Sequence, residues 1–515
     1  MLKKSALGWP KIAGLGIALV VAGQFSGWNF GLMAGGWLNM LIATLLMALL
    51  CGGLALCVAE LSTALPSAGG VFVYAQSAFG PFVGYLVGVA CALALTIGTG
   101  AAATFICAYT ESIFGLGGWP VKIALFAVII GIHMRGVGEA MGLTFIAGVI
   151  AVVALLTFGV AMAPHVELTH LLTLPANVAT PVSLGGIFAC VPFAIWLFIT
   201  VEQTGSAAEE AHNPGRTMPR GILAAIGTLL VTALVVLVCA PGAGGVELVG
   251  SAGDPLYAAM SSNSAFGEGS WLAKVIGCGA VFGLIATFFS LVYAASRQLF
   301  AMARDGLFPQ WLGKTGKRGT PYPALLLIGV IGLPLSEVDP ATVMLAVVLL
   351  LNVCYLFIFG AYLHIKRNQP ALPRPFTLVG GKLVAWLGLA LTLVVIAACF
   401  QLDMLMLIAL AVTFTLCIFN YLLRNRRTTT IEIPDHAGRH SPATPPSRAR
   451  QRFAAVLRQT SAPGARRRRL AVRRRRPPLP RRLQQRALRR SLQPPRDRGH
   501  APPGHHVEHP HSLPG

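Results

Sequence analysis

Long apolar runs alternate with short polar, glycine- or proline-containing connections from residue 12 to residue 423. A helix needs about 20 predominantly apolar residues to cross a hydrocarbon core of ~30 Å, and most of these runs are long enough. The predicted spans are 12–33, 38–60, 82–109, 120–134, 139–162, 185–205, 220–240, 272–302, 322–335, 341–364, 382–400 and 403–423. The pattern therefore predicts an all-α polytopic membrane protein with twelve transmembrane helices.

Two of the predicted spans are interrupted near their middle. The first contains Val21-Ala-Gly-Gln-Phe-Ser-Gly-Trp-Asn-Phe-Gly31, and the sixth has a comparable break between Val191 and Glu202. Backbone that leaves a helix within a membrane persists only where it is buried in protein or lines a wet cavity. Broken helices of this kind form the substrate sites of many transporters.

The two breaks divide the chain into repeats. Spans one to five (about 12–162) and six to ten (about 185–364) each open with a broken helix, and two further helices cover about 382–423. Repeats with an odd number of spans must be inverted relative to each other in the membrane. Paired breaks in corresponding positions predict a central binding site at the repeat interface.

Composition agrees with a membrane protein. The 515 residues are 55% hydrophobic and 11% charged, with a mean hydropathy of +0.69, which excludes an ordinary soluble domain. Up to Arg427, every Lys and Arg except Lys122 and Lys274 falls on one predicted face. The positive-inside rule makes that face cytoplasmic and places both termini there. We read a retained first span and no signal peptide.

The C-terminal segment differs chemically from the rest. Residues 1–423 carry 17 basic and 14 acidic residues, whereas residues 424–515 carry 23 Arg, no Lys and 4 acids. Such a composition cannot bury a core, so we predict that 426–515 is a disordered Arg/Pro-rich tail. It could bind anionic lipid or nucleic acid electrostatically, although we expect no nucleic-acid partner. The absence of Lys also raises the possibility of an out-of-frame origin.

Four stretches resemble the amino acid–polyamine–organocation permeases. The signature Glu60-Leu-Ser-Thr-Ala-Leu-Pro-Ser-Ala-Gly-Gly follows the second span, and segments 208–221, 296–306 and 320–323 match in the same order. The resemblance covers about residues 8–425 and implies a LeuT-type fold with two added C-terminal helices. Residues 25–32 and 192–198 are similar to the bacterial ethanolamine permease branch. Gln24 and Thr200 depart from that branch, where an acid and a glycine are usual.

The resemblance and the breaks together select the candidate binding residues. Backbone carbonyls and half-helix ends at the first break can hold a small ammonium group, and aromatic faces at the second can cover it. The alternative is that the glycines serve only close helix packing and the aromatics only packing. The predicted substrate-binding residues are Gly23, Gln24, Phe25, Ser26, Gly27, Phe193, Trp196 and Thr200.

Charged residues near the cytoplasmic side are candidates for coupling and gating. Glu202 lies in an otherwise apolar span, where a carboxylate is costly unless protonated, paired or solvated. The resemblance implies a role in proton coupling, and the alternative is a static hydrogen-bonded strut. The cytoplasmic gate candidates, which could equally be solvated loop charges, are Glu60, Glu209, Glu210, Arg216, Arg304 and Asp305.

Motifs for other chemistry are missing from the sequence. We find no Walker A loop, no HExxH or CxxC metal pattern and no GxSxG elbow, so we predict neither an enzyme nor a metal site or cofactor. The ten cysteines fall in apolar runs and are interpreted as buried small hydrophobes.

The sequence thus predicts a secondary transporter of a bacterial inner membrane. It would import ethanolamine or a similar small amine by alternating access, driven by a proton gradient or by exchange against another amine. The first alternative is an amino-acid permease of the same superfamily. The second is a membrane-anchored lipid or nucleic-acid binder that acts through the basic tail.

Overall fold

The computed structural model describes residues 8–429 except 68, 137–139, 210, 268, 317–318 and 402. The side chains of 140–143, 209 and 423–429 also lie outside the description. All of these described residues belong to one unit of the chain, Met1–Glu432. The predicted tail therefore lies outside the described residues from position 430 onward.

Ten helices of the described chain are long and apolar enough to cross a membrane. Their helical segments are α4 (Trp37–Ala64), α6 (Pro81–Phe114), α7 (Gly118–Arg135), α8 (Ala140–Met162), α10 (Leu184–Trp196) with η2 (Val201–Glu209), α11 (Pro214–Gly244), α14 (Trp271–Arg304), α16 (Pro340–Asn368), α17 (Gly381–Ala398) and α18 (Met404–Thr429). Two shorter apolar helices, α1 (Trp9–Val20) and α15 (Tyr322–Leu335), fill the remaining predicted positions. The all-α polytopic membrane fold is confirmed.

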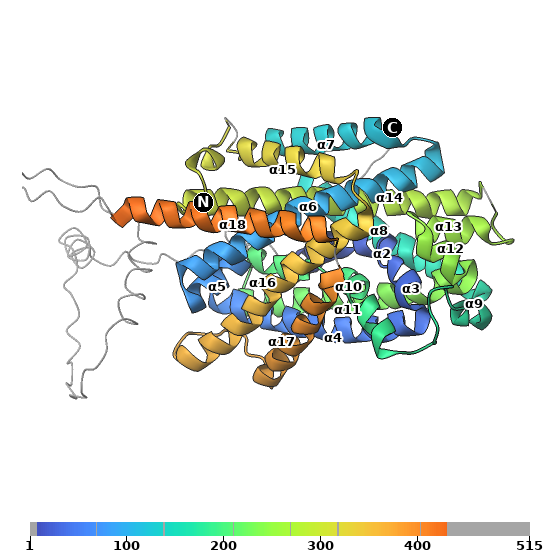
Figure 1. Cartoon of the computed structure of the whole chain (residues 1–515), viewed down its shortest axis with the longest axis horizontal. Helices are drawn as coiled ribbons and strands as arrows, with labels where there is room; N and C mark the ends of the chain where they lie inside the picture. Colours follow the sequence, from blue (N-terminus) through green and yellow to red (C-terminus); the bar gives the residue numbers. More distant parts are fainter. Residues whose placement is uncertain are drawn as a thin grey trace, which may run out of the picture. The chain divides into compact units, whose positions relative to one another are not determined.

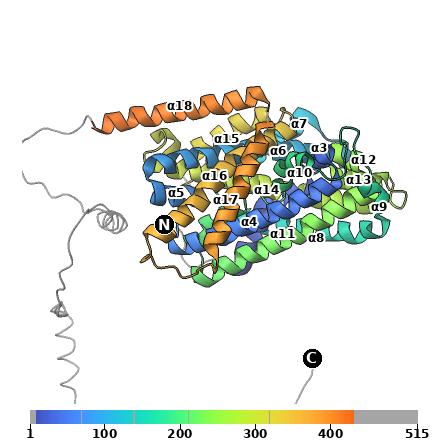
Figure 2. The ribbon, with the colours of Figure 1, turned by 60° about the horizontal axis from the view of Figure 1, so that its bottom comes forward.

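Several short helices lie between the long ones or at their ends. They are α2 (Ala22–Phe25), α3 (Phe30–Gly35), α5 (Val71–Phe79), α9 (Leu168–Leu172), α12 (Val246–Ser251), α13 (Pro255–Ser262), η1 (Ala163–His165), η3 (Gln310–Gly313) and η4 (Cys399–Gln401). Figure 1 places α5 at one end of the long helices and α9, α12 and α13 at the opposite end, and Figure 2 agrees. The short helices therefore lie at the two ends of the long ones.

The long helices form two groups. In one, α1 packs against α11, while α4 packs against α10 and α11; in the other, α6 packs against α14 and α15, and α7 against α15. Spans one and two thus join six and seven, while three and four join eight and nine. The division into two inverted five-helix repeats stays a prediction.

Burial separates central from peripheral helices. In the apolar 18-residue stretch of α6, 78% of the residues are buried inside the protein, whereas in the corresponding stretch of α18 only 6% are buried. In a bilayer, exposed apolar side chains contact lipid at little cost, so α18 needs few protein neighbours. Figure 2 shows α18 running along the outer side of the group. The central position of α6 makes it a wall of the site described next.

Candidate functional site

The first predicted break is present in α1–α3. Helix α1 ends at Val20, α2 covers only Ala22–Phe25, and α3 starts at Phe30. Gly27 has a φ of 99°, a conformation that glycine adopts without the strain that a Cβ would cause. Asn29 Oδ1 accepts the Gly27 N–H at 2.9 Å, and Asn29 Nδ2 donates to the Ala252 carbonyl at 2.8 Å. Side chains therefore replace the missing helical hydrogen bonds and tie the break to the α12–α13 connection.

The second break lies between α10 and η2, at residues 197–200. Thr200 has a φ of 73°, which is uncommon and unfavourable for a β-branched residue. Its backbone N–H donates to Tyr355 Oη at 3.3 Å and its Oγ1 donates to the Leu19 carbonyl at 2.9 Å. These bonds hold the strained residue between α16 and the end of α1. Such strain is typical of functional sites.

The two breaks touch directly. A Cβ added at Gly23 would lie 2.4 Å from the carbonyl oxygen of Trp196, so only glycine fits between them. Trp196 Nε1 donates to the Ser26 carbonyl at 3.2 Å, and Tyr109 Oη donates to the Phe25 carbonyl at 3.0 Å. Carbonyls released by the first break are thus partly satisfied by aromatic side chains.

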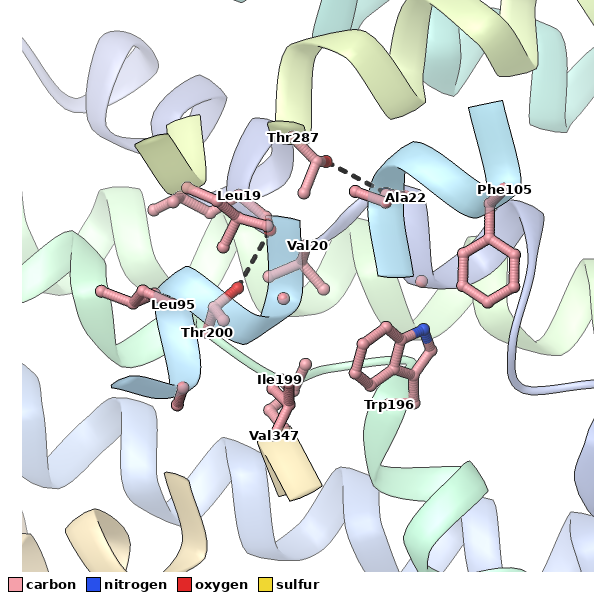
Figure 3. A pocket seen from close by; sticks show the side chains of 15 residues that line it. Leu19, Val20, Ala22, Leu95, Phe105, Trp196, Ile199, Thr200, Thr287 and Val347 are labelled. Atoms are coloured by element: carbon pink, nitrogen blue, oxygen red, sulfur yellow. Dashed lines mark hydrogen bonds between the residues drawn. The ribbon is translucent and has the colours of Figure 1, made fainter. Parts of the chain in front are cut away.

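A small enclosed cavity lies between the breaks (Figure 3). Its volume is about 30 Å³, room for roughly two water molecules. Fifteen described residues line it, and their polar side-chain groups are the Trp196 indole N–H and the hydroxyls of Thr200 and Thr287. The rest of the wall is apolar and includes Phe105 of α6 and Val347 of α16. In this conformation the space between the breaks is therefore too small for a substrate molecule.

The predicted binding residues divide into two sets. Gly23, Trp196 and Thr200 line the cavity. The side chains of five others lie outside its lining: Gln24, Phe25, Ser26, Gly27 and Phe193. Gln24 is buried and its Nε2 donates to the Leu229 carbonyl at 2.8 Å, while its Oε1 has no hydrogen-bond partner among the described residues. Ser26 Oγ donates to the Gly253 carbonyl at 2.8 Å. These two side chains brace the break against neighbouring segments.

Thr287 of α14 is a site residue that the sequence analysis missed. Its Oγ1 donates to the Ala18 carbonyl at 2.7 Å and accepts the Ala22 N–H at 3.3 Å, so one hydroxyl bridges both sides of the first break. Figure 3 shows it opposite Thr200. The only sequence signal was a hydroxyl within the apolar run of α14, one of several on that helix and common in membrane helices.

Glu202 lies beside the second break, and its side chain is outside the cavity lining. The residue is 1% exposed. Tyr355 Oη donates to Glu202 Oε2 at 2.7 Å and Gln203 Nε2 donates to Oε1 at 2.9 Å. Tyr355 also accepts the Thr200 N–H, so a hydrogen-bonded chain joins the carboxyl to the cavity wall. The described ion pairs include no cation on Glu202.

Glu60 belongs to a buried charge cluster at the opposite end from α12. Its carboxylate accepts from Tyr362 Oη at 2.8 Å and from the Leu378 N–H at 2.8 Å. Lys366 Nζ and Arg374 Nε lie 3.2 and 3.6 Å from its oxygens. The cluster joins α4 to the end of α16 and to the α16–α17 connection. The placement of Glu60 is therefore compatible with gating and equally with a purely structural role.

The other gate candidates are less informative. Arg304 and Asp305 form a 3.8 Å ion pair with each other on the exposed surface, and Arg216 is exposed at the start of α11. Glu210 and the side chain of Glu209 lie outside the described residues. Within the described part of the chain, no group of three or more His, Cys, Asp or Glu could hold a metal ion.

Comparisons with known proteins place these features in a family. A family model described as amino acid permease matches residues 7–421. The branched-chain amino acid permease BcaP of Bacillus subtilis is 26% identical over 383 residues, or 70% of this chain and 80% of that protein. An uncharacterized transporter of Rhizobium meliloti is 28% identical over 353 residues, or 64% and 74% of the two chains. The methylthioribose transporter of B. subtilis is 26% identical over 314 residues, covering 57% of this chain and 66% of that protein. None of the three is named as an ethanolamine permease.

Proposed function

Since this chain belongs to the amino acid permease family, we propose that it carries a small amino acid with an apolar side chain through the cavity between the two breaks. The family and the named relatives are transporters and not enzymes, and the ten apolar spans make this chain a multi-pass membrane protein. The predicted permease superfamily is thereby confirmed.

The apolar wall of the cavity is the observation that carries the proposal. Of its fifteen described lining residues, none has a charged side chain. The hydroxyls of Thr200 and Thr287 already donate to backbone carbonyls. Burying the hydroxyl of ethanolamine against Phe105, Leu291 and Val347 would therefore leave it without a partner, at a cost of ~1–3 kcal/mol. A short aliphatic side chain would instead gain about 25 cal/mol per Å² buried. The relative BcaP is named for branched-chain amino acids, which have such side chains.

The charged groups of an amino acid find complementary backbone at the breaks. The last residues of α1, Leu19 and Val20, line the cavity where the carbonyl end of a half-helix carries partial negative charge. Ala22 and Gly23 line it where α2 begins and the amide end carries partial positive charge. We assign the ammonium to the first pair and the carboxylate to the second. There they would replace the Thr200 hydroxyl at the Leu19 carbonyl and the Thr287 hydroxyl at the Ala22 N–H. Because the closed cavity admits only about two waters, binding requires the breaks to separate.

Proton coupling through Glu202 completes the proposal. The hydrogen-bonded chain from Glu202 through Tyr355 to Thr200 offers a path by which its protonation alters the second break. Glu60, with Lys366 and Arg374, is assigned to the gate at the far end. We further propose cytoplasmic termini in a bacterial inner membrane, from the predicted distribution of Lys and Arg. Cysteine placed near Gly250 should label from outside and near Gly215 should not; the reverse pattern refutes this orientation.

A competition assay tests the substrate. Purified protein in liposomes would be given labelled leucine, with unlabelled valine, alanine, lysine and ethanolamine as competitors. Valine should compete strongly and ethanolamine weakly, whereas saturable ethanolamine uptake that valine does not inhibit would restore the sequence-based hypothesis. Val347→Thr adds a hydroxyl to the wall and should weaken leucine uptake. Val343→Thr, on the same helix but outside the lining, is the matched control.

A further inference from the structure

A second hollow lies on the surface where η3 meets the start of α15. It is an open groove of about 430 Å³, lined by Trp311 and Lys314 at one end and by Tyr322, Leu326 and Val330 along α15. The residues on α15 recur every four positions and so form one stripe on the helix. Leu326 is 49% exposed and Val330 is 71% exposed. The groove is thus polar and basic at one end and apolar along its length.

The polar, basic end of the groove and its apolar length match the headgroup and the acyl chain of a single phospholipid molecule. The eight helical steps from Tyr322 to Val330 extend ~12 Å along the helix axis, a length suited to part of an acyl chain. Trp and Tyr side chains favour the boundary between hydrocarbon and headgroups, where their polar atoms stay wet. Lys314 is exposed beside them and can place its ammonium at the headgroup level.

The charge around the groove favours an anionic headgroup. Lys314 is the one charged residue among the described residues that line the groove, and it is cationic. Each basic residue near an anionic membrane surface is worth about one kcal/mol of attraction, or roughly a fivefold change in binding. A zwitterionic headgroup would gain much less.

The length of α15 gives the groove a physical reason. Its 14 residues extend ~21 Å, whereas the hydrocarbon core is ~30 Å thick. A short span is accommodated by local thinning or by flanking residues that reach to the interface. The groove at the start of α15, flanked by Trp311 and Lys314, offers one place for such accommodation.

We propose that this groove is a binding site for an anionic phospholipid, with the phosphate-bearing headgroup at Lys314 and an acyl chain along Leu326 and Val330. The site is separate from the cavity between the breaks and does not depend on the identity of the transported substrate.

Quenching of Trp311 fluorescence tests the proposal on the full chain in lipid nanodiscs. Acyl-brominated phosphatidylglycerol or phosphatidylcholine would be added at equal mole fractions, and the signal of Trp311→Phe would be subtracted to isolate Trp311. We expect half-maximal quenching at a lower fraction of phosphatidylglycerol. Lys314→Gln should raise that fraction about fivefold and leave phosphatidylcholine quenching unchanged.

The controls distinguish lipid binding in the groove from a general electrostatic attraction between the protein and anionic lipid. Lys382→Gln removes the same charge from the exposed start of α17 and should leave quenching unchanged. The Arg-rich tail is present in every variant, so it cannot produce the difference. Equal quenching by the two lipids, or equal effects of Lys314→Gln and Lys382→Gln, would overturn the proposal. Relief of quenching by free glycerol phosphate at millimolar concentration would overturn the lipid in favour of a soluble anion.

Discussion

Gly23→Ala should separate the two breaks and abolish transport. The new Cβ would lie 2.4 Å from the Trp196 carbonyl oxygen and 3.2 Å from its Cδ1. The nearer atom belongs to the backbone at a strained break and cannot rotate away, so α2 or the end of α10 must move. Overpacking of this kind costs ~1–3 kcal/mol, which exceeds the ~1 kcal/mol that alanine gains over glycine in a helix.

The assay compares thermal unfolding in detergent with leucine uptake in liposomes. Gly52→Ala is the matched control, because Gly52 lies within α4 and an added Cβ there meets no atom within 4 Å. We expect Gly52→Ala to keep both the unfolding temperature and uptake at or above those of the native protein. Gly23→Ala should lose uptake even where it folds. Native unfolding temperature and native uptake for Gly23→Ala would refute the direct contact between the breaks.

Three further changes probe coupling, the far gate and the α12–α13 connection. Glu202→Gln should weaken the dependence of uptake on a pH gradient more than it weakens leucine binding; an unchanged pH profile with normal uptake would make Glu202 a strut. Glu60→Gln should destabilise the protein by ~3–5 kcal/mol, because two largely buried cations lose their partner. The control Asp305→Asn, in an exposed pair, should change the free energy of unfolding by less than ~1 kcal/mol. Equal effects of the two variants in thermal unfolding would contradict the buried cluster. Burial raises the pKa of Asp254, against a smaller lowering by its hydrogen bond to Ser112. The stabilisation by neutral Asp254 is thus complete below the ordinary Asp pKa and is lost as pH rises through the raised value. Protection factors for hydrogen exchange in α12–α13, corrected for the intrinsic effect of pH on amide exchange, should therefore be higher in acid, and Asp254→Asn should remove that dependence. Protection factors that increase with pH would refute it.

The sequence predicted the breaks because their cause is local. Glycines and polar side chains within an apolar run cannot continue a lipid-exposed helix without a partner. The stretch around Gly23 and Gly27 therefore revealed the first break. The second was expected between Val191 and Glu202 and lies at residues 197–200, because α10 continues through Pro192. The strain at Thr200 was not visible, since its φ depends on bonds to Leu19 and Tyr355, which are distant in the chain.

Contacts between distant segments explain what the sequence could not show. Glu60 and its partner Lys366 are 306 positions apart, and no local pattern links them. Gln24 was selected by its position in the break, yet its side chain turns toward α11 and away from the cavity lining. Thr287 was overlooked because a single hydroxyl in a membrane helix usually bonds to its own preceding turn. The short helices α12 and α13 were missed because they lack the length that identifies a span.

A cryo-electron microscopy structure of the reconstituted protein with leucine tests the central claim most directly. The account predicts density between the breaks, with the ammonium near Leu19 and Val20, the carboxylate near Ala22 and Gly23, and Trp196 moved away from Gly23. Leucine density at any other place, with the Trp196 carbonyl still closed against Gly23, would contradict it.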